Sequence, residues 1–165
     1  MSHDHRKASD WPELIAQARA LVDGEPNAIA NAANLSALLY HNLPDVNWVG
    51  FYFVDGDGLV VGPFQGLPAC VRIPMGKGVC GTAAARKETV VVSDVNAFEG
   101  HIACDAASRS EIVVPLIRNG EVFGVLDVDS PVHGRFDNAE DRAGLERVVQ
   151  SYVAAHDTTA AGGVD

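Results

Sequence analysis

The chain has 165 residues, 47% of them hydrophobic, which fits one globular domain with a proper core. Its formal net charge of −10 argues against nucleic acid or anionic membranes as partners, because both bind basic surfaces. The sequence has no apolar run near the roughly 18–20 residues that span a bilayer, and its polar start does not resemble a secretory signal. We therefore expect a cytoplasmic protein with no nucleic-acid or membrane partner.

Two helices are predicted at the start of the domain. In the first, Asp10 is a suitable cap, Pro12 fits the first turn, and apolar residues recur at helical spacing. After a break at residues 23–26, the second helix runs from about residue 27 to 43, and Pro44 ends it.

The middle of the chain is predicted to alternate strands and loops. The pattern indicates strands over 47–54, 59–64, 71–73 and 89–92, with a short helix over 79–86. In the first strand, Trp48 and Tyr52 share a face with Gly50 between them. The missing side chain leaves room for a ligand or a neighbouring backbone, although an aromatic core pair is the alternative interpretation.

A hairpin is the most informative part of the sequence. Apolar runs over 112–117 and 122–128 flank Asn119 and Gly120, and both residues tolerate the positive φ of a type I′ turn. The loop before this hairpin, residues 96–110, is long and polar, and loops of that length are often functional.

Three carboxylates, Glu111, Asp127 and Asp129, lie in or beside the hairpin strands. Two of them are two residues apart and share a face with Phe123 and Val125, so an apolar face turns acidic at one end.

The register of this hairpin decides whether Glu111 lies beside the other two carboxylates. A strict two-residue turn would place Glu111 opposite Val128 rather than Asp129. Glu111 can join the other carboxylates only if one extra residue is absorbed, and we expect a bulge near Pro115, which cannot donate to the ladder.

The last helix is predicted to start with Asp137 as its cap and Glu140 three residues on, and to end near residue 156. Strands bracketed by terminal helices predict an α+β fold, with one antiparallel sheet and the terminal helices on one face. We expect a flexible N-terminus over 1–10, one domain over 11–156 and a disordered tail over 157–165.

The three cysteines are Cys70, Cys80 and Cys104. An odd number argues against a disulfide framework, and the absence of a C-x-x-C pair argues against structural zinc, so we predict no metal. They can be buried small hydrophobes. Alternatively, Cys80 lies near the start of a predicted helix, where the dipole can lower a thiol pKa.

Five motifs together resemble those of the free methionine-(R)-sulfoxide reductases, which are GAF-domain enzymes: NWVGFYF, GPFQG, CxRIPxGxGVCG, HIACDAAS-x-SEIVVP and GVLDVDSP. The resemblance covers roughly Asn31 to Leu145. It implies a six-stranded antiparallel sheet with helices on the back, a ligand pocket on the front, and reduction of the R epimer of free methionine sulfoxide.

The resemblance also implies residue roles. Cys104 matches the attacking cysteine, Cys70 the resolving cysteine, and Cys80 a third cysteine with an auxiliary or alternative role. The substrate-pocket residues that match are Trp48, Tyr52, Glu111, Asp127 and Asp129. The family implies no bound cofactor, thioredoxin as external reductant, and a possible homodimer.

The chemistry needs these groups. Sulfoxide reduction requires a thiolate to attack sulfur and a proton for the departing oxygen. Crowded carboxyl groups raise one another's pKa, so that one can hold a proton near neutral pH, and we expect Asp129 or Glu111 to donate it. His101 could orient Cys104 or be incidental. The alternatives to an enzyme are a non-catalytic GAF small-molecule sensor and a redox sensor that uses a Cys70–Cys104 disulfide.

Overall fold

The computed structural model describes residues 10–101 and 107–156. The expectations for residues 1–9, for Cys104 and for the tail over 157–165 lie outside the described residues. The helices are α1 (Trp11–Val22), α2 (Ala28–Asn42), α3 (Gly78–Arg86) and α4 (Ala139–Ala155). The strands are β1 (Trp48–Asp55), β2 (Gly58–Gly66), β3 (Arg72–Pro74), β4 (Val90–Val92), β5 (Ser110–Arg118) and β6 (Glu121–Ser130).

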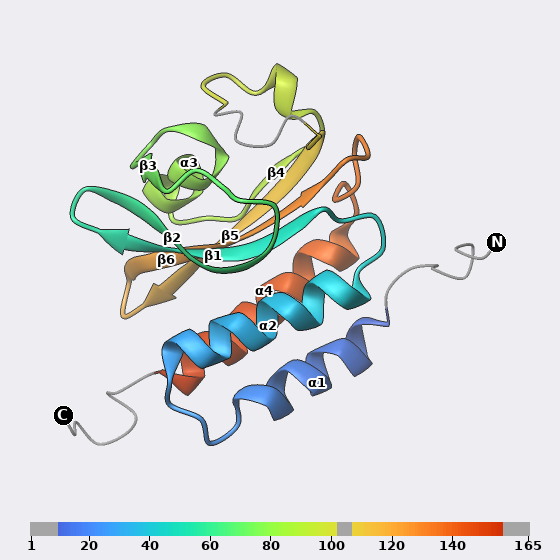
Figure 1. Cartoon of the computed structure of the whole chain (residues 1–165), viewed down its shortest axis with the longest axis vertical. Helices are drawn as coiled ribbons and strands as arrows, with labels where there is room; N and C mark the ends of the chain where they lie inside the picture. Colours follow the sequence, from blue (N-terminus) through green and yellow to red (C-terminus); the bar gives the residue numbers. More distant parts are fainter. Residues whose placement is uncertain (1–9, 102–106, 157–165) are drawn as a thin grey trace.

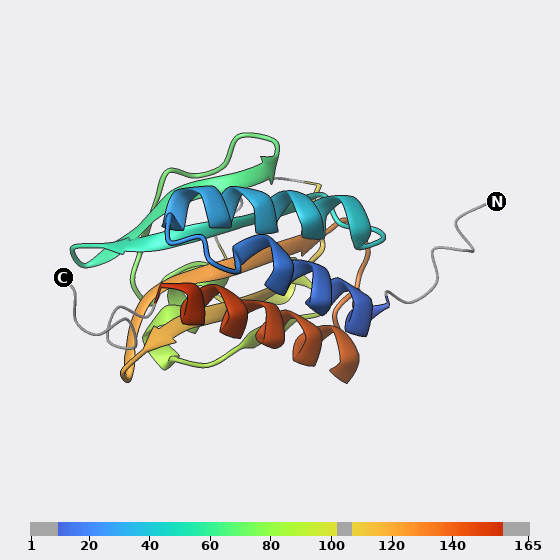
Figure 2. The same cartoon turned by 90° about the horizontal axis from the view of Figure 1, so that it is seen from below.

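The six strands form one antiparallel sheet in the order β3-β2-β1-β6-β5-β4, which confirms the predicted α+β class and strand count. Helices α2 and α4 pack on one face of the sheet, and α1 lies outside them (Figures 1 and 2). Helix α3 and its flanking loops cover the opposite face (Figure 1). None of the helices in the described ranges is long and apolar enough to cross a membrane.

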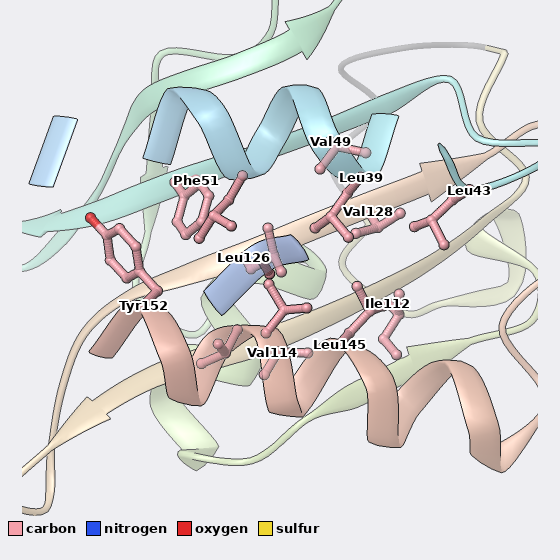
Figure 3. Close-up of a cluster of buried hydrophobic side chains, with 14 of the residues drawn as sticks. Leu39, Leu43, Val49, Phe51, Ile112, Val114, Leu126, Val128, Leu145 and Tyr152 are labelled. Atoms are coloured by element: carbon pink, nitrogen blue, oxygen red, sulfur yellow. The ribbon is translucent and has the colours of Figure 1, made fainter. Parts of the chain in front are cut away.

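The main hydrophobic core lies between the sheet and the helices α2 and α4. Figure 3 shows side chains from both layers pointing toward one another, among them Leu39, Leu126 and Leu145, all fully buried. The Phe51 and Tyr152 rings meet with their centroids 4.9 Å apart, which joins β1 to α4. Burial of this kind stabilises each large side chain by roughly 1.5–3 kcal/mol and fixes the sheet as a rigid platform.

The helix ends follow local side-chain chemistry, with one correction to the sequence analysis. Asp10 caps α1 as predicted, accepting a hydrogen bond from the Glu13 N–H at 3.3 Å. Helix α4 is capped by Asn138 rather than by Asp137, because the Asn138 side chain accepts from the Asp141 N–H at 2.8 Å. Asp137 instead accepts a hydrogen bond from the Ser93 hydroxyl, which ties the cap to the end of β4.

The predicted hairpin joins β5 to β6. Asn119 has φ 54° and Gly120 has φ 79°, as a type I′ turn requires. Glu111 pairs with Asp129, so the extra residue is absorbed as predicted.

The bulge itself lies elsewhere than predicted. Pro115 pairs regularly with Val125, and the register shifts between Leu116 and the next residue of β5. Leu116 pairs with Gly124 and Ile117 with Val122, so Phe123 is the extra residue of β6. The slip turns Phe123 to the helix-covered face, where it packs with the main core, while Val125 stays on the other face. The prediction that these two side chains share a face with the carboxylates is therefore wrong for Phe123 and correct for Val125.

Candidate active site

A small cavity of about 50 Å³ lies on the face of the sheet that α3 covers. It is lined by Trp48, Tyr52, Pro68, Ala69, Ile73, Gly78, Val79, Cys80, His101, Ser108, Glu111, Asp127 and Asp129. All five predicted pocket residues and Cys80 are among them.

Strand pairing brings the predicted side chains together. Asp129 on β6 pairs with Trp48 on one side and with Glu111 on the other, so these three form one row across β1, β6 and β5. Asp127 lies in the next row and pairs with Gly50. Directly paired residues project from the same face of an antiparallel sheet, so the three carboxyl groups converge under α3.

Burial makes this carboxyl cluster unusual. Glu111 and Asp127 are only 8% and 5% exposed. Desolvation raises the pKa of Glu111 well above its ordinary value, and the charge of Asp127 adds to the rise. The pKa of Asp127 is likewise raised, first by burial and then by the charge of Asp129. Crowding was the expected cause, but burial is the larger one. A raised pKa of this kind favours the protonated form of a carboxyl group.

Cys80 enters the same cluster from the N-terminal turn of α3. Its Sγ lies 4.0 Å from Glu111 Oε2, and the residue is buried with a free thiol. Its pKa is raised well above the ordinary value, by burial and then by the charges of Asp127 and Glu111. The suggestion that the helix N-terminus lowers this pKa is therefore wrong, because desolvation and three nearby carboxyl groups outweigh the helix dipole.

The ligand atoms of Cys80, Glu111 and Asp127 all lie within 4.8 Å of one another, close enough for a metal ion. A metal would bind their deprotonated forms, and all three have raised pKa values that disfavour those forms. The sequence-based expectation of no metal stays a prediction.

The aromatic rings of Trp48 and Tyr52 form one wall of the pocket. The Trp48 ring stacks on Phe64 at a centroid distance of 5.1 Å and approaches the Tyr52 ring at 5.9 Å. A Cβ on Gly50 would lie 2.6 Å from Trp48 Cη2, so the missing side chain makes room for the indole itself, not for a ligand. The aromatic core pair is therefore the correct interpretation of this position, and the Trp48 and Tyr52 rings also line the cavity.

The loop between β2 and β3 carries Cys70. This cysteine is disulfide-bonded, in contrast to the free Cys80. The Tyr52 hydroxyl donates to the Cys70 carbonyl oxygen at 3.0 Å, and Trp48 Nε1 donates to the Leu67 carbonyl oxygen at 3.0 Å.

The sequence analysis missed several lining residues. Gly78 and Val79 begin α3 beside the cavity, and Pro68 and Ala69 precede Cys70. The Gly-rich PMGKG run before α3 was the available signal for a close approach of backbone to a ligand. His101 also lines the cavity, where burial lowers its pKa.

Comparison with known proteins places this geometry in a family. The GAF domain model matches residues 27–155. The free methionine-R-sulfoxide reductase of Escherichia coli is 54% identical over 143 residues, covering 87% of this chain and 86% of the relative. The enzyme of the same name from Saccharomyces cerevisiae is 44% identical over 146 residues, covering 84% and 81%.

A solved structure extends the match to three dimensions. The structure of fRMsr of Staphylococcus aureus in complex with substrate has a TM-score of 0.87 and 47% identity, covering 91% of this chain and 97% of that one. The chain therefore belongs to the GAF-domain family, and within it to the free methionine-R-sulfoxide reductases.

Proposed function

We propose that this protein is an oxidoreductase that reduces free L-methionine-(R)-S-oxide to L-methionine, with Cys104 as nucleophile, Cys70 as resolving thiol and thioredoxin as external reductant. The observation that carries the proposal is the convergence of Glu111, Asp127 and Asp129 beside an aromatic wall in one buried cavity. This carboxyl cluster supplies both a proton donor for the sulfoxide oxygen and a negatively charged site for the substrate ammonium group. Relatives with this name and a structure with bound substrate support the same activity.

Substrate recognition follows from the lining. The Trp48 and Tyr52 faces suit the S-methyl group, because aromatic rings contribute large apolar contact area. A carboxylate of the cluster that stays ionised attracts the substrate ammonium. The first N–H groups of α3, around Val79 and Cys80, suit the substrate carboxylate, since a helix N-terminus favours anions.

The reaction needs two thiols and one proton donor. The Cys104 thiolate attacks the sulfoxide sulfur and forms a sulfur–sulfur bond to it, while a carboxyl group protonates the oxygen. The resulting hydroxyl group then transfers to the Cys104 sulfur as the S–O and S–S bonds to the substrate sulfur break, so that methionine leaves with the electron pair of the S–S bond and Cys104 becomes a sulfenic acid. Glu111 or Asp129 is the proposed donor, and the raised pKa of Glu111 suits it to that role. The Cys70 thiol then condenses with the sulfenic acid, releasing water and forming a disulfide. The disulfide bond of Cys70 and the free thiol of Cys80 support this assignment of roles.

The test is thioredoxin-coupled NADPH oxidation with three substrates: the free R epimer, the free S epimer and peptide-bound methionine sulfoxide. We expect turnover on the free R epimer alone, abolished by Cys104→Ser and reduced by Cys70→Ser. Cys80→Ser should retain turnover if that residue is auxiliary. Binding of methionine without turnover on any substrate would instead favour a sensor.

The cytoplasmic location and the homodimer remain predictions. Light scattering of the purified protein tests the homodimer.

A further inference from the structure

We propose that Phe64 is a positioning residue that holds the Trp48 indole in place and thereby restricts the S-alkyl group of the substrate to methyl. This inference rests on the proposed function, because that function places the substrate S-methyl group against the Trp48 and Tyr52 rings. Phe64 is not among the described residues that line the cavity, so its effect on the substrate passes through Trp48.

Sheet pairing brings the Phe64 ring onto the indole. Phe64 on β2 pairs directly with Gly50 on β1, so both residues belong to the same face of the sheet, where Phe64 packs with the second core. Because Gly50 has no side chain, the Trp48 indole folds across it and stacks on Phe64, with 18° between the ring planes. A Cβ on Gly50 would collide with Phe64 Cβ and with the indole, so any other residue there would separate the two rings.

The backbone holds the pyrrole edge of the indole. Gly66 pairs with Trp48 and has φ 130°, a conformation that L side chains rarely adopt. A Cβ there would lie 2.6 Å from Trp48 Cδ1, so this edge of the indole rests against the Gly66 backbone. Trp48 Nε1 also donates to the Leu67 carbonyl oxygen at 3.0 Å. These contacts hold one edge of the indole, and the Phe64 ring supports its face.

Phe64 supports the indole from the side away from the carboxyl cluster. The strand order β2-β1-β6-β5 places Phe64 on β2, Trp48 on β1 and the three carboxyl groups on β6 and β5. Phe64 and the carboxyl groups therefore lie on opposite sides of Trp48. Trp48 is only 3% exposed, so its surroundings are closely packed and the indole cannot turn toward β2 without displacing the Phe64 ring.

The consequence is a fixed wall beside the S-alkyl group of the substrate. A wall that cannot move rejects a group that is larger by one methylene, and such discrimination in an apolar pocket amounts to about 10–200-fold in kcat/KM. A smaller aliphatic side chain in place of the Phe64 ring leaves space behind the indole. The indole then moves back, so that an S-ethyl group fits better and the S-methyl group loses contact. Selectivity between the two alkyl groups falls, although every residue that touches the substrate is unchanged.

The test measures kcat/KM for the free R epimers of methionine sulfoxide and ethionine sulfoxide, which differ by one methylene in the S-alkyl group. Calorimetric binding of methionine and ethionine gives the same comparison without turnover. Phe64→Leu is compared with Phe53→Leu, a matched control because the Phe53 ring is also partly buried and stacks on an aromatic ring, that of Phe51, at 16° on the helix-covered face of the sheet. Phe64→Tyr keeps the stacking ring, and Phe64→Met keeps an apolar side chain without a flat ring.

We expect the methyl-to-ethyl ratio of kcat/KM to fall at least about fivefold in Phe64→Leu and Phe64→Met, with a parallel fall in the ratio of binding constants. In Phe64→Tyr and Phe53→Leu the ratio should stay within about twofold of wild type. An unchanged ratio in Phe64→Leu and Phe64→Met, an equal fall in Phe53→Leu, or a wild-type protein that does not distinguish the two alkyl groups overturns the inference. Binding of methionine without turnover by wild type would overturn the proposed function instead, and the binding ratios would still decide the role of Phe64.

Discussion

Gly81 in α3 is a position where two physical effects oppose each other. Glycine inside a helix costs roughly 1 kcal/mol relative to alanine, so helix propensity alone predicts that Gly81→Ala stabilises the protein. Packing predicts the opposite. A Cβ at Gly81 would lie inside 3.0 Å of the Pro74 carbonyl oxygen and 3.1 Å from Gly76 N, and both are backbone atoms that cannot rotate away.

The magnitudes decide the sign. To admit the methyl group, α3 must move away from the loop over residues 74–76 by about 1 Å. That shift weakens the hydrogen bond that Gly76 N–H donates to the Gly81 carbonyl oxygen at 2.9 Å, which is worth about 1 kcal/mol. Overpacking of this kind costs about 1–3 kcal/mol. With the gain in propensity subtracted, we expect Gly81→Ala to lower the free energy of unfolding by about 1–3 kcal/mol.

The same shift displaces the neighbouring Cys80 and the N-terminal turn of α3, which line the cavity. A misplacement of about 1 Å can cost on the order of 100-fold in rate, so kcat/KM should fall at least about tenfold. Urea unfolding followed by circular dichroism measures the stability, and Asn34→Ala, on the exposed face of α2, measures propensity alone, with an expected gain of about 0.5 kcal/mol. If Gly81→Ala is as stabilising as this control, the close backbone approach does not govern α3.

Three further substitutions test the electrostatics. Because burial raises the pKa of Glu111, the folded state keeps this proton to a higher pH than the unfolded state, so the contribution of Glu111 to stability is complete at low pH and is lost as pH rises through the folded pKa. Glu111→Gln removes this loss, so we expect the variant to gain stability over wild type from about pH 5 to 9 in urea titrations. The same variant should lose most activity. Burial lowers the pKa of His156, so its contribution is complete above about pH 6.5 and lost as pH falls, and His156→Gln should flatten the loss of thermal stability between pH 7 and 5. Asp141→Ala leaves the mostly buried Arg135 guanidinium without its ion pair and should lower the free energy of unfolding by about 3–5 kcal/mol, measured in urea.

Local patterns were enough to predict the helices, the strands and the acidic end of the hairpin. Period-two alternation placed Asp127 and Asp129 on one face, and Asn119-Gly120 gave the turn. Both signals depend on neighbours within a few residues. Trp48 and Tyr52 were assigned to the pocket through motif resemblance, since no local pattern brings Trp48 next to β6.

The pKa of Cys80 shows what local sequence leaves out. A position near a helix N-terminus predicts a lowered thiol pKa, and that effect extends over one turn. Burial is the main cause of the raised pKa, and the charges of Asp127 and Glu111, which are far along the chain and reach the thiol because β5 and β6 pair under α3, add to it. The burial comes from the packing of Cys80 in the second core. Tertiary burial therefore reverses a correct local argument.

The position of the bulge depends on Gly124 rather than on Pro115. Proline cannot donate to a ladder, but β4 pairs with β5 only from Glu111 to Val113, so Pro115 lies beyond the second ladder and need not disturb it. Gly124 carried the better evidence. A Cβ there would lie 2.5 Å from the Tyr52 carbonyl oxygen, so glycine is required where β6 bends against β1. An isolated glycine in a strand indicates a bulge or a close backbone approach, and this one is both. Hairpin length thus demands one extra residue, and the glycine identifies where the sheet can accept it.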